Sequence, residues 1–280
     1  MHIDPMEKKP LFHFHPGEPV LSLGSIGCNL RCANCQNYSI SQASFGSAAL
    51  EPLRPEDVVR IARENSCRAV AFTYNEPTIW HEFCFDVFEL CRKQGIATIY
   101  VTNGFIEREP LQELSTCLDA MNIDVKGFTE DFYRQVCRAR LGPVLEAVKL
   151  AYQLGIHVEL TYLIIPTRND GESEIRSFCK WAVESLGAKV PVHFSRFHPD
   201  YLMHDLPATP GRTMEMALRV GKEEGLRHVY LGNYHSTEGE NTRCPRCGSL
   251  SIRRSGYHVD KIGLADGRCS KCGEDLNIVV

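Results

Sequence analysis

The sequence predicts an α/β fold: a partial (β/α)6-type parallel barrel followed by a small cysteine-rich C-terminal module. Two observations carry this prediction. Short apolar, β-branched runs alternate with helical patterns from about residue 19 to residue 233, and four cysteines form two close pairs after residue 243. Six or seven strand–helix units are fewer than the eight of a closed barrel, so an open doubly wound sheet is the alternative arrangement.

Seven short segments have the composition of strands that are covered on both faces. In chain order they are 19–26, 68–74, 98–102, 121–126, 158–165, 192–197 and 229–232. Repeated alternation with helices implies right-handed crossovers between parallel strands. We therefore expect the chemistry to lie in the loops that follow the strands, at their carboxyl ends.

Four segments between these strands have clear helix signals. The first, 55–65, begins with a proline in its first turn, followed by Glu56 and Asp57, which the helix dipole favours there. The other three end at a glycine, which is a common C-terminal cap. They are 142–154, 171–186 and 213–224.

Composition excludes several classes of protein. With 43% hydrophobic and 24% charged residues, the 280-residue chain can bury a sizeable core and is not disordered. The net charge of −4 provides no chain-wide field for nucleic acid or an anionic membrane. No apolar run approaches the roughly 18–20 residues of a membrane helix, and the first twelve residues contain no apolar stretch of signal-peptide length. We expect a cytoplasmic protein without a membrane partner.

Cysteine spacing suggests metal or cluster binding in a reducing compartment. The chain has 13 cysteines, an odd number, and seven of them stand in short-spaced clusters, which argues against a secreted disulfide framework. We divide the chain into three parts: an N-terminal segment (1–18), a barrel core (19–235) and a C-terminal part (236–280). The C-terminal part consists of a polar linker followed by a metal ribbon with four cysteines.

The first cluster follows the first barrel strand directly. Cys28, Cys32 and Cys35 lie on one tight loop, one ligand short of a closed tetrahedral zinc site. Three thiolates suit a [4Fe–4S] cluster with one iron open to an outside ligand. The alternative is a structural zinc site that a distant histidine or cysteine completes.

The spacing Cys28-x3-Cys32-x2-Cys35 after the first strand resembles that of the radical S-adenosylmethionine (SAM) enzymes. The longer stretch from Cys28 to Gln42 and the opening Ile3 to Phe14 resemble the AmmeMemoRadiSam system radical SAM enzyme, a group similar to the pyruvate formate-lyase activating enzymes. The resemblance covers essentially the whole chain.

This resemblance implies roles for residues after the second strand. Asn75-Glu76-Pro77 is similar to the Gly-Gly-Glu-Pro turn of the family, and the Glu76 carboxylate could accept hydrogen bonds from the methionine ammonium of SAM. The alternative is a simple turn built around Asn75 and Pro77 with a solvated Glu76. Beside the cysteine cluster, we favour SAM binding.

The next strand ends imply further SAM contacts. Thr102 and Asn103 end the third strand, and Asp124 and Lys126 lie on the fourth; the matching segments of the activating enzymes line the SAM pocket. A plain Asp124–Lys126 ion pair on one face of the strand is an equal alternative. By resemblance, His198 would border the adenosine, although a histidine before proline is also a common turn residue.

Two features depart from the family pattern. Many radical SAM enzymes have an aromatic residue before the third cysteine, where this chain has Asn34, so adenine packing must differ and could use Tyr38. Relatives of this group often carry a cysteine-rich N-terminal extension, whereas this sequence begins inside the matching region, as a short-start form or a truncation would.

The second cluster has the spacing of a zinc ribbon. Cys244, Cys247, Cys269 and Cys272 form two C-x2-C-Gly knuckles, and four thiolates close a tetrahedral site. We predict one structural metal, zinc in the first instance; rubredoxin-type iron or an auxiliary cluster would use the same sulfurs. The basic residues around the module are interpreted as a solvated rim, so nucleic acid is not an expected partner.

The resemblance implies a radical SAM enzyme. A [4Fe–4S] cluster on Cys28, Cys32 and Cys35 would cleave SAM reductively to a 5′-deoxyadenosyl radical, which abstracts hydrogen from a substrate. The sequence does not identify the substrate: the reaction could activate a protein, or it could modify a small molecule or a peptide. Implied partners are an electron donor such as ferredoxin or flavodoxin, and Memo-like and AMMECR-like proteins. The alternative function is a zinc-dependent scaffold or nucleic-acid-binding protein in which both clusters are structural.

Overall fold

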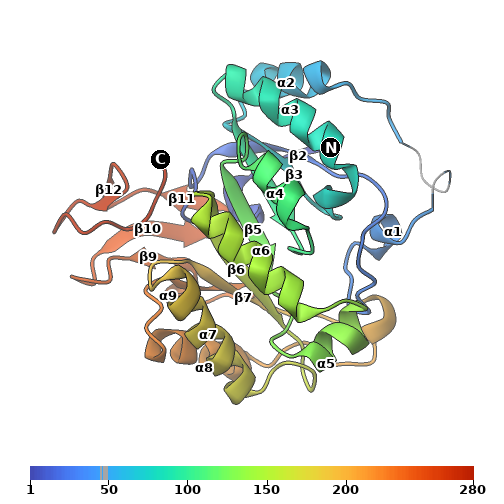
Figure 1. The fold of residues 1–280 in the computed structure, drawn as a ribbon. Helices are drawn as coiled ribbons and strands as arrows, with labels where there is room; N and C mark the ends of the chain where they lie inside the picture. The colour runs from blue at the N-terminus through green and yellow to red at the C-terminus, as the bar shows by residue number, and fades with distance from the viewer. Residues whose placement is uncertain (45, 47–49) are drawn as a thin grey trace.

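A computed structural model describes residues 1–44, 46 and 50–280 of the chain. Its centre is an eight-stranded sheet whose strands follow one another in chain order (Figure 1). The strands are β1 (His2–Pro5), β2 (Pro19–Leu23), β3 (Ala69–Phe72), β4 (Ala97–Thr102), β5 (Ala120–Asp124), β6 (His157–Ile164), β7 (Val192–Arg196) and β8 (Val229–Gly232). Strands β2 to β8 are parallel, and β1 and β8 are the two edges, so the barrel is open.

The predicted parallel α/β fold is confirmed, and each of the seven predicted strands is present. Strand β1 is an addition that the sequence did not reveal. It pairs antiparallel with β2, with Ile3 opposite Leu21. Its four residues include an aspartate and a proline, so no apolar run marks it, and its pairing with β2 supplies the hydrogen bonds that hold it.

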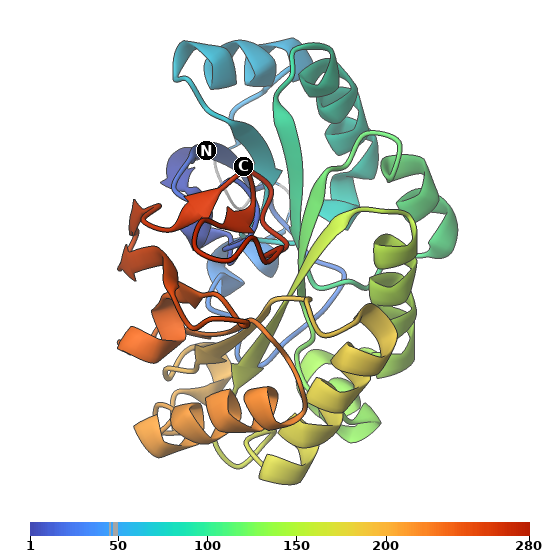
Figure 2. The same cartoon turned by 90° about the vertical axis from the view of Figure 1, so that its left-hand side faces the viewer.

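Helices cover the outer face of the curved sheet (Figures 1 and 2). The long ones are α2 (Pro55–Glu64), α3 (His81–Lys93), α4 (Arg108–Leu114), α6 (Leu141–Gln153), α7 (Glu172–Leu186) and α8 (Gly211–Glu223). Shorter segments lie in the loops: η1 (Met6–Lys8), α1 (Tyr38–Ser41), η2 (Pro77–Trp80), α5 (Glu130–Phe132), the π-helix η3 (Tyr133–Cys137), η4 (Tyr201–Met203) and α9 (Thr237–Glu240). The four predicted helices correspond to α2, α6, α7 and α8.

Small side chains on the inner face of the sheet make room for the N-terminal segment. Ala69, Ala71 and Ala97 form a buried cluster with Met6 and Leu11. Because alanines on neighbouring strands leave space above the sheet, the apolar side chains of residues 6–14 fill one end of the barrel. The opposite end, where the parallel strands finish, stays open.

The C-terminal module lies on the concave side of the sheet, close to both chain termini (Figure 2). Its strands are β9 (Thr242–Arg243), β10 (Leu250–Ser255), β11 (His258–Asp260), β12 (Leu264–Ala265) and β13 (Arg268–Cys269). The tail pairs with the N-terminal segment: His15 N donates to Val279 O at 2.8 Å, and Val279 N donates to His13 O at 2.8 Å.

Within the polar stretch expected to be a linker (234–243), residues Thr237–Glu240 form a packed turn of helix, α9. Ser236 caps α9 by accepting a hydrogen bond from Gly239 N at 3.2 Å. A Cβ atom at Gly239 would lie 2.7 Å from Cγ of Leu231, so the helix packs tightly against β8. Polar composition alone did not distinguish a capped turn of helix from a solvated linker.

Candidate functional site

A cavity of about 920 Å³ opens at the carboxyl ends of the parallel strands. The predicted cluster cysteines lie in its wall, and so do six of the seven residues predicted to contact SAM. These residues are Cys28, Cys32, Cys35, Asn75, Glu76, Thr102, Asn103, Asp124 and Lys126. They come from the loops after β2, β3 and β4 and from the end of β5, as expected for parallel strands whose ends meet at one edge.

The seventh residue, His198, is not part of the cavity wall. Its side chain is 55% exposed, and its Nδ1 lies 3.2 Å from Nε2 of Gln36, the residue after the third cysteine. His198 therefore adjoins the outer end of the cysteine loop through Gln36.

The cysteine loop is held in place by backbone hydrogen bonds from both sides. Asn75 accepts from Ser25 N at 3.0 Å and donates to Gly27 O at 2.9 Å, so it fixes the turn before Cys28. On the other side, Arg31 N donates to Cys137 O at 3.1 Å. The π-helix η3, which ends at Cys137, thus supports the loop, and π-helical turns often occur at functional sites.

The three cysteines of the first loop are free thiols, and all three line the cavity. Three thiolates on one loop are one ligand short of a closed tetrahedral zinc site. They suit a [4Fe–4S] cluster with one iron left open to an outside ligand, and the adjoining cavity has room for such a ligand.

Glu76 and Lys9 are the most enclosed charged side chains of the cavity wall, each with 1% exposure. One carboxylate oxygen accepts from Thr78 Oγ1 at 2.6 Å and Thr102 Oγ1 at 2.7 Å, and the other accepts from Asn103 N at 2.8 Å. Burial raises the pKa of the carboxyl, and these hydrogen bonds oppose the rise. Oε2 has a single partner among the described residues, so one of its acceptor positions stays available to a ligand.

Asn103 joins the third strand to the first cluster cysteine. Its Nδ2 lies 2.8 Å from Oδ1 of Asn29 and 3.7 Å from Sγ of Cys28. Its Oδ1 accepts from Phe105 N at 2.8 Å. Asn103 thus positions the loop residue Asn29 and donates toward a thiol that is proposed to hold iron.

Asp124 and Lys126 form the ion pair that was one of the two predicted arrangements, with 2.5 Å between Nζ and Oδ2. Both residues also line the cavity, so the pair faces the space above the cluster loop. Burial lowers the pKa of the Lys126 ammonium, but the Asp124 charge beside it raises the pKa above its usual range overall. Lys126 therefore stays protonated, and the two opposite charges are fixed side by side at the cavity wall.

Adenine packing was predicted to depend on Asn34 and Tyr38. Asn34 lies inside the cavity wall and Tyr38 lies outside it. Asn34 lines the cavity with 6% exposure, and its Oδ1 has no hydrogen-bond partner in the described structure. The ring of Tyr38 stacks on Tyr201, with 4.5 Å between ring centroids, and lies outside the cavity wall. Asn34, rather than Tyr38, is the residue that a ligand in the cavity would meet.

The cavity also has walls that sequence reasoning missed. Lys9 and Phe12 from the N-terminal segment and Tyr257 from the C-terminal module line it. These three residues lie far apart in the chain and far from the barrel motifs, so no local spacing signals their role.

A buried polar network reaches the cavity wall at His193. The Glu159 carboxylate accepts from His13 N at 2.7 Å and lies 2.7 Å from His193 Nε2 and 3.1 Å from His157 Nε2. Burial raises the pKa of this carboxyl, but the two histidines bring it well below its usual range. The only sequence signal was the i, i+2 spacing of His157 and Glu159, which places both on one face of β6.

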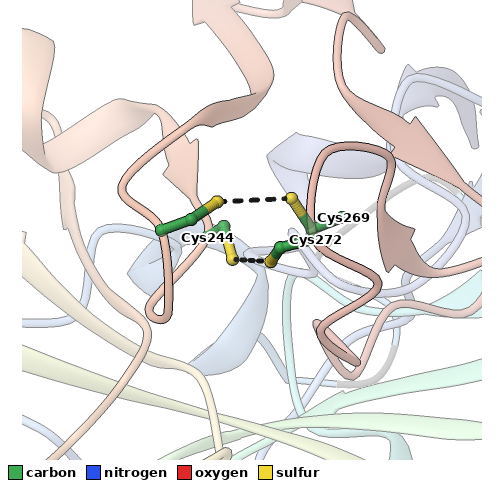
Figure 3. A group of neighbouring side chains, drawn as sticks. Cys244, Cys269 and Cys272 are labelled. Atoms are coloured by element: carbon green, nitrogen blue, oxygen red, sulfur yellow. Dashed lines mark hydrogen bonds between the residues drawn. The ribbon is translucent and has the colours of Figure 1, made fainter.

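The four C-terminal thiols form a compact second centre (Figure 3). Their ligand atoms all lie within 4.8 Å of one another; Cys244 and Cys272 are 3.5 Å apart, and Cys247 and Cys269 are 3.7 Å apart. In each knuckle the glycine after the second cysteine, Gly248 or Gly273, has a positive φ and donates its N–H to the first cysteine carbonyl. This spacing suits one tetrahedral metal ion.

Comparison with known proteins identifies the family of this chain. Residues 23–181 match the radical SAM superfamily. The chain belongs to this superfamily. It is 47% identical over 280 residues to an uncharacterized protein of Methanocaldococcus jannaschii, covering 99% of this chain and 83% of that protein.

More distant similarities concern an activating enzyme by sequence and a solved structure by fold. The pyruvate formate-lyase-activating enzyme of Clostridium pasteurianum is 23% identical over 194 residues, which cover 65% of this chain and 81% of that enzyme. The crystal structure of Streptococcus suis SuiB bound to precursor peptide SuiA has a similar fold, with a TM-score of 0.60 and 14% identity over 82% of this chain and 51% of that one.

Membership has direct consequences for this radical SAM protein. It is an enzyme, and the family implies a [4Fe–4S] cluster, SAM, a reductant and a substrate. The first cysteine loop and its cavity contain the donor groups that such a cluster and cofactor require. In the described residues, no helix is both long and apolar enough to cross a membrane.

Proposed function

We propose that this enzyme holds its cluster on Cys28, Cys32 and Cys35 and cleaves SAM reductively in the adjoining cavity. A cluster held there would supply one electron to SAM, and cleavage of the bond between the sulfonium sulfur and the 5′ carbon would give methionine and a 5′-deoxyadenosyl radical. That radical would take a hydrogen atom from a substrate and become 5′-deoxyadenosine. The observation that supports this most is the location of three thiols in one wall of a cavity beside Glu76, Asn103 and Lys126.

The residues of this chain would bind and orient SAM. The remaining acceptor position of Glu76 would take the methionine ammonium, and the charged pair Asp124–Lys126 would face its carboxylate. Asn75 and Thr102 hold the loop and the Glu76 side chain in position. His198 would border the adenosine from the outer end of the loop. Walls from Phe12 and Tyr257 would exclude water from the radical.

The C-terminal thiols would bind one structural metal, zinc in preference to iron. Four thiolates close the coordination sphere, so this centre has no open position for chemistry. The four cysteines belong to the core of their own module, together with Ile252 and Leu276.

The substrate and the protein partners are also proposals. The cavity accepts a small molecule or the end of a peptide, and protein activation is the other reaction that relatives suggest. The electron donor would be a ferredoxin or flavodoxin. Memo-like and AMMECR-like proteins would act alongside the enzyme. Their link to this chain rests on the sequence resemblance alone.

The decisive experiment is anaerobic reconstitution with iron and sulfide, followed by SAM and dithionite, with 5′-deoxyadenosine measured by mass spectrometry. Cys32→Ala should abolish the product, whereas the matched control Cys179→Ala, a buried core cysteine on α7, should keep it. Product that persists in Cys32→Ala would contradict the proposed cluster site. A colourless protein with zinc on the first loop would contradict the proposed function as a whole.

A further inference from the structure

Three exposed arginines lie around the outer side of the cysteine loop. Arg31 is on the loop itself, and Arg138 and Arg140 form the turn that follows the π-helix η3. The two segments are joined by hydrogen bonds from Arg31 N to Cys137 O at 3.1 Å and from Ala33 N to Val136 O at 2.9 Å. The arginines therefore belong to one surface, directly behind the loop that carries the cluster ligands.

The positive charge of this surface is not neutralised within the protein. Among the described residues, none of the three guanidinium groups has a carboxylate partner, and Arg31 donates instead to Oε1 of Gln42 at 3.0 Å. The nearby acids are already engaged: Asp131 pairs with Arg134, and Glu130 accepts from Gly142 N at 3.1 Å. A local cationic surface is notable on a chain with a net charge of −4.

An exposed apolar residue also contacts the loop. Leu202 is 64% exposed, and its N–H donates to Ala33 O at 3.1 Å. Asp200 and Asp205 flank it in sequence, so the positive charge is confined to the side of residues 31 and 138–140. Apolar contact next to a charged rim is the usual composition of a protein docking site.

We propose that Arg31, Arg138, Arg140 and Leu202 form the docking surface for an acidic protein that carries single electrons to the cluster. This inference rests on the proposed function, because it needs a cluster on the loop. The inner side of the loop faces the cavity that SAM and substrate would fill, so a carrier must approach from outside. On that outer side, the end of η3 contacts the loop directly, since Arg31 N donates to Cys137 O at 3.1 Å.

The electron balance of the step is simple. A reduced flavodoxin in its hydroquinone form gives one electron to the oxidised cluster and becomes the semiquinone. The acidic surface of the carrier would pair with the arginines, which raises the rate of encounter and makes the step sensitive to salt.

The test is stopped-flow reduction of the reconstituted cluster by flavodoxin hydroquinone, followed by the loss of cluster absorbance in the absence of SAM. In R138E/R140E we expect the second-order rate constant to fall by about tenfold or more at low salt, because like charges then face each other. The rate with dithionite should stay within about twofold of that of the unchanged enzyme, because a small reductant needs no docking surface. R63E, an exposed arginine on α2, is the matched charge control.

Three outcomes would overturn the docking proposal: equal flavodoxin rates in all variants, an equal loss in R63E, or an equal loss with dithionite. The last would show that the turn supports the cluster itself. Since this measurement needs neither SAM nor substrate, it separates the docking surface from the proposed reaction. A cluster that is reduced normally but forms no 5′-deoxyadenosine would contradict the reaction and leave the docking result valid.

Discussion

The guanidinium of Arg254, in the C-terminal module, lies 3.3 Å from the carboxylate of Glu7, in the N-terminal segment 247 residues away. Both side chains are almost wholly buried, and Arg254 also stacks over the ring of Phe12 at 4.1 Å. Its second amino group donates to Phe12 O at 2.8 Å. Because Phe12 lines the cavity, this contact connects the C-terminal metal module to the wall of the candidate active site.

Arg254→Met should therefore destabilise the fold strongly. The substitution keeps much of the side-chain volume but leaves the Glu7 carboxyl buried without its cation, which typically costs about 3–5 kcal/mol. Urea unfolding measures the loss, and the adjacent Arg253→Met, an exposed position on β10, is the control. The double variant with Glu7→Gln should recover part of the stability. A loss of the same size in both single variants would show that the buried pair is not the cause.

Loss of the C-terminal metal should loosen the module while the first cluster keeps its iron. Cys247→Ser with Cys272→Ser removes two of four thiolates, so zinc should fall from about one ion per chain to nearly none. Limited proteolysis should then cleave the chain between residues 244 and 272 faster than in the unchanged protein. Metal analysis decides the identity of this site: if iron and not zinc is lost, the assignment to zinc is wrong.

The features of the fold and of the site that could be predicted are those marked by a pattern of residues close together in the sequence. Alternating strands and helices revealed the parallel sheet, and the Cys28–Cys35 spacing and Glu76 turn revealed one wall of the cavity. Strand β1 was missed because it depends on pairing with β2. Phe12, Lys9 and Tyr257 could not be assigned to the cavity, since only tertiary contacts bring them to it. His198 has a motif-based role, but its exposed side chain leaves that role a prediction.

Glu76→Gln should weaken both the local structure and SAM binding. A glutamine presents an N–H₂ group to one of the donors that Glu76 now accepts, from Thr78, Thr102 and Asn103. One buried donor is then unpaired, at a cost of about 1–3 kcal/mol. Loss of the charge should also raise the dissociation constant for SAM by about tenfold or more.

Two measurements separate the effects of Glu76→Gln, urea unfolding without SAM and calorimetric titration with SAM. Glu82→Gln, an exposed position on α3, is the control and should change neither. If Glu76→Gln lowers stability but binds SAM as tightly as the unchanged protein, the carboxylate is a structural group of the turn and not a ligand for the methionine ammonium.

His228 should make the fold sensitive to acid. Its ring is buried against His13, with 4.4 Å between centroids, and its Nε2 has no partner among the described residues. Burial lowers its pKa to about 4 from an ordinary value of 6.5. The folded state thus favours the neutral ring. The contribution of His228 to the free energy of unfolding is therefore complete above about pH 6.5 and is lost as the pH falls toward 4, by about 3 kcal/mol in all.

His228→Phe should flatten the pH dependence of the unfolding free energy across this window, whereas His235→Phe, at a 99% exposed position, should not. Identical pH profiles for the unchanged protein and His228→Phe would exclude this histidine as the acid-sensitive group.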